Sequence, residues 1–122
     1  MDKIVIPLQL MTLNQYTNAN RTNRYSGAKA KKQATEICRV HTLQAVEAGF
    51  KLHDLPAEFE FNWFLNNRRT DPDNIAFQKK FILDGFVAAG LLANDGWGEI
   101  AGWTEKFHIV KKEFQRVEIK EV

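Results

Sequence analysis

The chain has 122 residues, of which 44% are hydrophobic and 11% aromatic, and a formal net charge of +2 at pH 7. These values are typical of a globular domain and exclude an intrinsically disordered chain. No apolar run approaches the roughly 18 residues that span a bilayer, and the N-terminus lacks the residue order of a signal peptide. We therefore predict one domain, residues 1–122, in a cytoplasmic protein that enters no membrane. The single cysteine, Cys38, excludes an intrachain disulfide and a thiolate zinc site.

The charge is unevenly distributed. No acidic residue lies between Asp2 and Glu36, whereas this interval carries Lys3, Arg21, Arg24, Lys29, Lys31 and Lys32. A basic N-terminal third favours a polyanionic partner such as nucleic acid. A run of solvated surface charges is an equally good interpretation of composition alone.

The N-terminal half predicts a strand, a loop and a helix. Alternation over Lys3–Leu8 predicts a strand, and Pro7 places it at a sheet edge because proline donates no ladder hydrogen bond. Leu10–Tyr25 is rich in Asn and Thr and has no period, which predicts a long loop of the kind that often carries function. Ser26 is predicted to cap a helix that ends at Gly49.

The C-terminal half predicts three strands and one helix. Strong alternation of aromatic and polar residues makes Ala57–Leu65 the clearest strand. The other predicted elements are a helix over Pro72–Ala89 that stops at Gly90, and strands over Ile100–Val110 and Phe114–Ile119 in a hairpin around Lys111 and Lys112. The order β-α-β-α-β-β predicts an α+β fold, a single mixed four-stranded sheet with two helices packed on it.

The segment Asp71–Asn74 carries the most chemistry. Asp, Pro and Asp at the start of a helix are also an ordinary capping sequence, so this motif alone does not indicate a site. Arg68 and Arg69 directly precede it, and a helix start does not require them. Carboxylates that hold a metal against DNA need such cations, because they otherwise repel the phosphate backbone.

Helical phase selects a lysine. At 100° per residue, Asp73, Lys80 and Asp84 share a narrow arc opposite the apolar face, whereas Lys79 lies near that face. Lys80 is therefore the predicted functional lysine. For Asp84, an i, i+4 ion pair with Lys80 is at least as good an interpretation as metal binding.

Asp95 follows this helix. A helix of 18 residues is about 27 Å long, so Asp95 meets Asp71 and Asp73 only if the chain doubles back or a second subunit supplies it. Clustered carboxylates suit Mg²⁺, which takes oxygen ligands and keeps several waters, and Mn²⁺ can substitute. We predict Asp71, Asp73 and Asp95 as metal ligands and Lys80 as their electrostatic partner at a phosphodiester. The histidines form no close pair that would suit a metal.

With these residues in this order, the chain resembles the RusA family of phage-borne Holliday-junction endonucleases over nearly its whole length. The resemblance is carried by the strand at Ile4–Pro7, the Asn-rich segment around Asn14, the basic helix, the segment Arg68–Asn74, Lys80 with Asp84, and Ala89-Gly90 followed by Asn94-Asp95. Phe77 stands where the family commonly has its lysine, and Asn94-Asp95 replaces the usual pair of late acids. The resemblance implies a Mg²⁺-dependent homodimer that cuts paired strands of a four-way junction in recombination and repair, with Asp71, Asp73, Asp95 and Lys80 in the active site.

Three hypotheses follow. The leading one is an endonuclease acting on branched DNA, with phosphate contacts from Arg68, Arg69, Lys29, Lys31, Lys32, Arg21 and Arg24, and with Asn14 in a loop that probes the junction. The second is a branched-DNA-binding protein without catalysis, in which the acids only cap helices and form ion pairs. The third is a small interaction protein whose basic segment binds an acidic partner.

Overall fold

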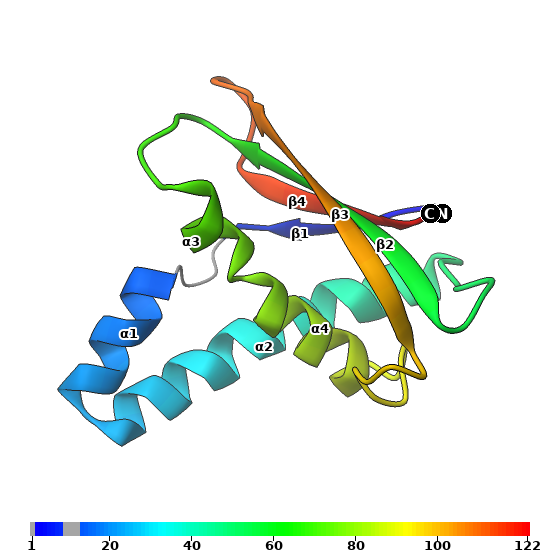
Figure 1. The fold of residues 1–122 in the computed structure, drawn as a ribbon, viewed down its shortest axis with the longest axis horizontal. Helices are drawn as coiled ribbons and strands as arrows, with labels where there is room; N and C mark the ends of the chain where they lie inside the picture. The colour runs from blue at the N-terminus through cyan, green and yellow to red at the C-terminus, as the bar shows by residue number, and fades with distance from the viewer. Residues whose placement is uncertain (1, 9–12) are drawn as a thin grey trace.

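The computed structural model describes residues 2–8 and 13–122, apart from the side chains of residues 13, 14, 16 and 24. In this part of the chain, one four-stranded sheet packs against four helical segments (Figure 1). The strands are β1 (Ile4–Pro7), β2 (Ala57–Leu65), β3 (Ile100–Ile109) and β4 (Arg116–Glu121), and the helices are α1 (Leu13–Thr22), α2 (Arg24–Glu47), α3 (Pro72–Ala76) and α4 (Lys79–Ala88). The predicted α+β fold with a single mixed sheet is confirmed, whereas α1 lies in the segment predicted as a loop and the second predicted helix is divided into α3 and α4.

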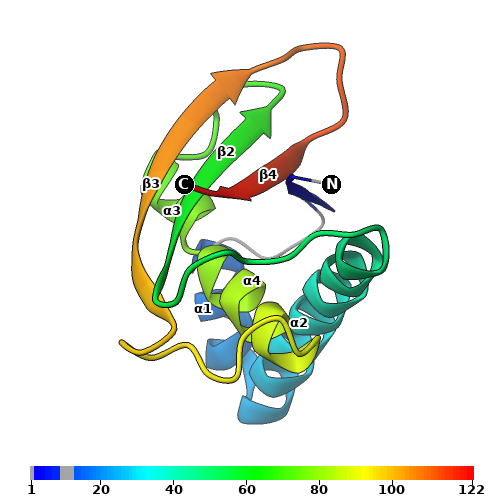
Figure 2. The same ribbon diagram turned by 90° about the vertical axis from the view of Figure 1, so that its right-hand side faces the viewer.

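The strand order is β1-β4-β2-β3, with β3 parallel to β2 and β4 antiparallel to both β2 and β1. The predicted β3–β4 hairpin is therefore wrong, because β4 lies on the far side of β2. The connection between them passes the end of β2 (Figure 2), where the Asn66 side-chain amide donates to the carbonyls of Val110 (2.9 Å) and Glu113 (2.8 Å). These bonds satisfy carbonyls that a hairpin ladder would otherwise have paired.

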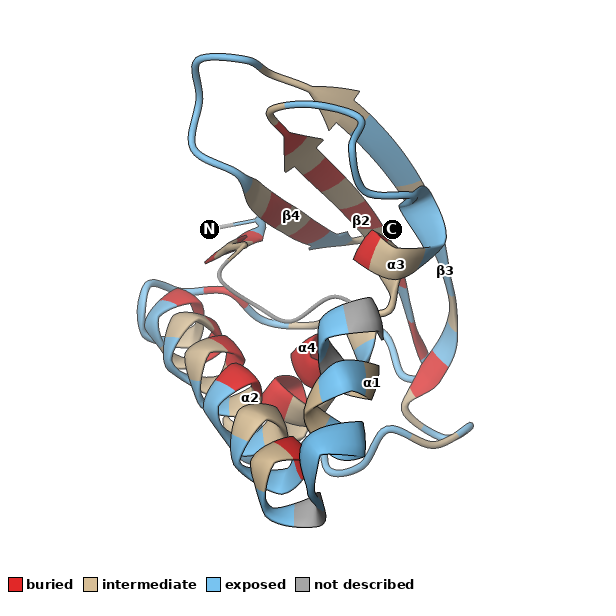
Figure 3. Cartoon of the chain, turned by 90° about the vertical axis from the view of Figure 1, so that its left-hand side faces the viewer, coloured by how far each residue is buried: buried red, intermediate tan, exposed pale blue. Residues whose placement is uncertain are grey.

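The two faces of the sheet differ, as alternation along the strands requires. On β2 and β4, buried residues alternate with partly exposed ones (Figure 3). The outer face carries ion pairs, with Glu60 3.2 Å from both Lys106 and Lys120. Prediction of β2 from its alternation is thus confirmed to the residue, and the helices cover only the inner face.

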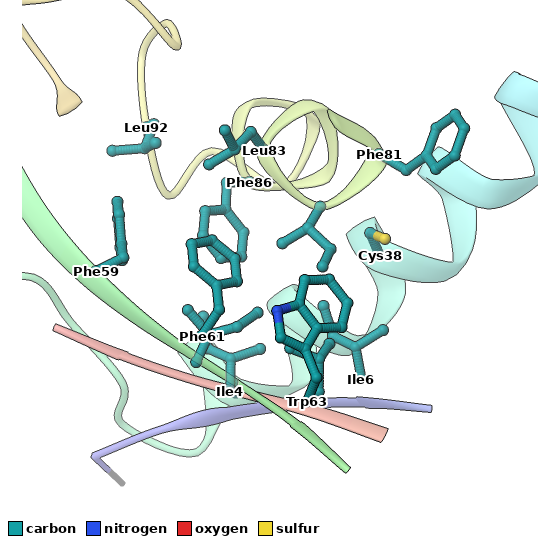
Figure 4. Close-up of a cluster of buried hydrophobic side chains, with 14 of the residues drawn as sticks. Ile4, Ile6, Cys38, Phe59, Phe61, Trp63, Phe81, Leu83, Phe86 and Leu92 are labelled. Carbon is teal, nitrogen blue, oxygen red and sulfur yellow. The ribbon is translucent and has the colours of Figure 1, made fainter. Parts of the chain in front are cut away.

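The core lies between the inner face of the sheet and the helices (Figure 4). Phe59, Phe61 and Trp63 of β2 are fully buried, and the Phe59 ring lies 5.6 Å from that of Phe86 on α4. The Cys38 side chain from α2 is also fully buried in this cluster. Burial raises the pKa of the Cys38 thiol to about 12, with a further contribution from the Asp84 carboxylate, so this thiol is not a nucleophile at neutral pH.

Residues 13–22 form α1 rather than part of the predicted loop, and α2 begins immediately after Asn23. The backbone of Asn23 is extended (φ −173°, ψ 163°), and its side chain accepts a 2.6 Å hydrogen bond from the Ser26 N–H. Asn23, not Ser26, is therefore the helix cap. The low helix propensity of Asn and Thr is overridden by packing of α1 against α2. None of the helices in the described range is long and apolar enough to cross a membrane.

The predicted helix over Pro72–Ala89 is broken into α3 and α4 at Phe77 and Gln78. Around the break the backbone makes i→i−3 hydrogen bonds, such as Lys80 N–H to Phe77 C=O (3.1 Å). The buried Gln78 side chain donates to the Ile75 carbonyl at 3.1 Å. A tighter turn changes the helical phase, so residues before and after the break do not share the arc that a continuous helix gives them.

Gly85 marks the closest approach of α4 to α2. A Cβ atom at this position would lie 2.4 Å from the Cys38 Cβ and 3.0 Å from the Arg39 backbone nitrogen. We expect Gly85→Ala to lower the free energy of unfolding by about 1–3 kcal/mol, because overpacking outweighs alanine's better helix propensity. Urea unfolding measures this change. Gly98→Ala, where no atom lies within 4 Å of the added Cβ, is the control, and a Gly85→Ala protein as stable as wild type would contradict the close packing.

Candidate functional site

The acid pair, Asp71 and Asp73, lies at the start of α3. Asp71 occupies the N-cap position with an extended backbone, and Pro72 follows as the first helical residue, as the capping interpretation predicts. The Asp71 side chain nevertheless makes no capping hydrogen bond. Both residues are exposed, and one Asp73 carboxylate oxygen accepts the Asn74 N–H at 3.0 Å. The Asp71 carboxylate therefore leaves the helix end uncapped, whereas the Asp73 carboxylate satisfies one N–H group of the first turn.

Arg68 and Arg69 lie in the loop between β2 and α3, separated from Asp71 only by Thr70. Both are exposed, and the Arg69 N–H donates to the Asn67 side chain at 3.0 Å. Among the described residues, neither arginine forms an ion pair with Asp71 or Asp73. The guanidinium groups and the carboxylates are thus close in sequence, but they are not paired with each other in direct contacts.

The two lysines at the start of α4 have different surroundings. Lys79 is 14% exposed, and its ammonium lies 2.8 Å from the Glu105 carboxylate of β3. Glu105 also accepts the Trp63 indole N–H at 3.1 Å, and the Lys79 ammonium lies 5.4 Å from the centre of the Trp103 ring. Lys79 therefore belongs to the packing between α4 and the sheet, as its predicted place near the apolar face indicates.

Lys80 is exposed and lines a pocket of about 380 Å³ together with Asp95. We call it the Lys80–Asp95 pocket. It is lined mainly by Lys80, Leu83, Asp95, Trp97, Ile100 and Trp103. The chain reaches it by reversing after α4, where Gly90 has φ +80° and Leu92 is buried. The chain thus reverses after α4, but it places Asp95 in a pocket with Lys80 and not in a metal-holding group with Asp71 and Asp73.

The three aspartates predicted to share a metal do not gather in one copy of the chain. Within the described ranges 2–8 and 13–122, no group of three His, Cys, Asp or Glu side chains could hold a metal ion. The acid pair lies at the start of α3, and Asp95 lies with Lys80 beside α4. The residues of the predicted site thus lie in two places within one chain, a carboxylate pair near arginines and a pocket lined by one lysine and one aspartate.

Asp84 does not form the predicted pair with Lys80. Its carboxylate lies 3.9 Å from the Lys31 ammonium of α2. This long, partly exposed contact joins the two helices and contributes little stability. The pairing also separates Lys31 from the other basic residues of α2, because Lys31 faces α4.

The remaining predicted DNA contacts are spread over the helical layer. Lys29 and Lys32 line a groove of about 740 Å³ along α2, beside Tyr25, whose side chain is 75% exposed. Arg21 is exposed at the end of α1. The side chains of Asn14 and Arg24 lie outside the described residues.

Two residues that sequence reasoning did not single out, Trp97 and Trp103, form walls of the Lys80–Asp95 pocket. The available signal was a tryptophan within the turn segment, Trp97, followed by a second one in the next strand, Trp103. Comparison with known proteins adds no relative, because neither a family model nor a curated protein matches the chain. The function is therefore inferred from the site residues themselves.

Proposed function

We propose that this chain is a cytoplasmic, metal-dependent endonuclease that cuts branched DNA, including four-way junctions, in recombination and repair. The observation that carries the proposal is the acid pair, two exposed carboxylates that follow two exposed arginines with only Thr70 before Asp71, which lies at a capping position but makes no capping bond. An Asp at the N-cap commonly bonds the first turn with its carboxylate, and without that bond the Asp71 carboxylate is available to a ligand. Arg68 and Arg69 are suited to hold phosphate groups beside the carboxylates.

The acid pair fits a magnesium ion in its donor chemistry. Mg²⁺ is commonly bound through one or two carboxylates, several waters and substrate phosphates, so Asp71 and Asp73 would hold it, with Mn²⁺ as a substitute. When bound, the ion would activate water and neutralise charge on the phosphodiester. Lys80 is proposed to stabilise negative charge on the DNA, and Asp95 to act beside it as part of the same pocket.

A homodimer is part of the proposal. Two symmetric cuts in a junction require two equivalent sites, which a two-fold dimer provides. The separation of Asp95 from the acid pair within one chain supports the same assembly, since a second copy can offer its own Lys80–Asp95 pocket to the acid pair.

A second candidate is a branched-DNA-binding protein without catalysis. It is favoured by the lack of a three-ligand group among the described residues of one chain. Under this alternative, Arg68, Arg69, Lys29 and Lys32 bind phosphates and the acid pair has no metal to hold.

The deciding experiment compares a synthetic four-way junction with linear duplexes of the same sequences. We expect paired nicks in the junction in Mg²⁺ or Mn²⁺, no nicks in EDTA, and little cutting of the duplexes. Denaturing gels of each labelled strand measure the cuts, and fluorescence anisotropy measures binding. Tight junction binding with no cutting at any Mg²⁺ or Mn²⁺ concentration would overturn the endonuclease in favour of the binding protein, and no DNA binding at all would overturn both.

A further inference from the structure

Two of the three tryptophans in this chain lie at its surface. Trp97 is 92% exposed and Trp103 is 44% exposed, whereas Trp63 is fully buried in the core. Large exposed aromatic side chains that line one pocket indicate a binding surface more often than single scattered apolar residues do. Both line the Lys80–Asp95 pocket, so the pocket combines flat apolar walls with one cation and one anion.

The pocket has the size and composition of a ligand site. Its volume of about 380 Å³ lies within the usual range of small-molecule pockets, and Leu83 and Ile100, both buried, form its apolar floor. Trp103 is held from behind, because the Lys79 ammonium lies 5.4 Å from its ring centre and is itself fixed by Glu105. Trp103 is therefore supported by a contact with the α4 side of the pocket, whereas Trp97 is almost fully exposed.

We propose that this pocket binds a single unpaired base of branched DNA, stacked against Trp97 and Trp103, with Asp95 accepting a hydrogen bond from an exocyclic amino group and Lys80 contacting the adjoining phosphate. The proposal rests on the proposed function and specifies its substrate as DNA with an unpaired base at the branch. Bases stack on exposed indole rings without regard to sequence. A carboxylate accepts from the exocyclic amino group of cytosine, whereas thymine has a carbonyl oxygen at that position and offers only an N3–H flanked by two carbonyl oxygens that repel a carboxylate. The pocket therefore prefers cytosine to thymine.

The charges of the pocket favour a nucleotide over a protein segment. Lys80 and Asp95 lie at the polar end of an otherwise apolar pocket, and a nucleotide offers an anionic phosphate to one and a base donor to the other. A second copy of the chain, covering the tryptophans at a dimer interface, is the competing occupant, and the experiment below separates the two.

The test measures binding in EDTA, so that it does not depend on cleavage. Fluorescence anisotropy compares three labelled duplexes, one with a single extrahelical cytosine, one with an extrahelical thymine and one fully paired. For wild type we expect the highest affinity for the duplex with the extrahelical cytosine, a lower affinity for the one with the extrahelical thymine, and the lowest for the fully paired duplex. We expect Trp97→Ala to bind the cytosine bulge about tenfold more weakly and the paired duplex equally well.

Two matched variants complete the test. Trp97→Phe keeps an aromatic ring and is expected to restore most of the affinity, whereas Phe114→Ala removes another exposed aromatic residue, 61% exposed and outside the pocket, and is expected to change nothing. Because Trp97 is almost fully exposed, its substitution should leave the thermal melting temperature within a degree or two.

Three results would overturn the base pocket. One is equal binding of the cytosine bulge by wild type and Trp97→Ala, the second is no preference of wild type for the bulge over paired DNA, and the third is a Trp97→Ala protein that sediments as a monomer where wild type is a dimer. Junction cleavage with any of these results would leave the endonuclease intact while removing the pocket. Bulge binding that depends on Trp97, without any junction cleavage, would support the base pocket and remove the endonuclease.

Discussion

Asp73→Asn is expected to lower junction cleavage at least about a hundredfold while leaving junction binding within about twofold. The carboxylate would hold the metal that neutralises charge on the phosphodiester, and an amide is a much weaker ligand for a hard cation. The fold should tolerate the change, because an Asn oxygen can still accept the Asn74 N–H that Asp73 accepts at 3.0 Å. Loss of a negative charge in the first turn of α3 costs about 0.3–1 kcal/mol.

Asp84→Asn is the matched control. It removes a carboxylate of the same type from α4, but that carboxylate lies 3.9 Å from Lys31 and not in the proposed site. We expect single-turnover cleavage within about twofold of wild type, and a similarly small change in stability. Equal losses of activity in both variants would show that the effect reflects charge or folding in general and would remove Asp73 from the metal site. Full activity in Asp73→Asn would remove the acid pair altogether.

Local pattern determined β2 because its pleat places Phe59, Phe61 and Trp63 on a single buried face. The same local pattern could not predict which strands are neighbours. β3 and β4 follow one another in the chain with only six residues between them, and such strands often form a hairpin. Here Asn66 fixes the connection across the end of β2, and a single polar side chain of this kind carries no signal in the periodicity.

The helix α1 shows the limit of intrinsic propensity. Its Asn- and Thr-rich sequence favours a loop in isolation, yet it packs closely on α2, so that a Cβ at Gly27 would lie only 3.3 Å from the Asn20 Cα. Tertiary packing of this kind depends on residues distant from the propensity window. The Asn-rich segment, predicted to probe a junction as a loop, is helical over the residues that the structure describes.

Helical phase predicted the surroundings of the two lysines of α4, but its use across Phe77 and Gln78 assumed a helix that is broken there. It separated Lys79 from Lys80 correctly, since Lys79 contacts Glu105 and Lys80 is exposed. Its arc for Asp73 and Asp84 assumed a continuous helix through Phe77 and Gln78, which the structure does not have, so that arc stays a prediction. The buried Gln78 side chain, bonded to the Ile75 carbonyl, accompanies the tighter turn there, and this bond depends on the surrounding packing.

The neighbouring lysines of α4 give the second large prediction. Lys79→Met is expected to lower the free energy of unfolding by about 2 kcal/mol and to leave the cleavage rate of the folded protein nearly unchanged. It would leave the Glu105 carboxylate, 22% exposed, without its cation. A fully buried pair broken in this way costs about 3–5 kcal/mol, and the partial exposure of both partners makes the expected loss smaller.

Lys80→Met should do the opposite. Its side chain is exposed, and no ion pair involves it among the described residues, so stability should change by less than about 0.5 kcal/mol. We expect single-turnover cleavage to fall about a hundredfold, the typical effect of removing one group that stabilises developing charge. Urea unfolding and single-turnover cleavage are measured on both variants. We expect stability to fall only in Lys79→Met and the cleavage rate to fall only in Lys80→Met. Suppose that Lys79→Met, fully folded in the absence of denaturant, loses cleavage activity while Lys80→Met keeps it. Lys79 is then the functional lysine, and the proposed role of the Lys80–Asp95 pocket in catalysis is wrong.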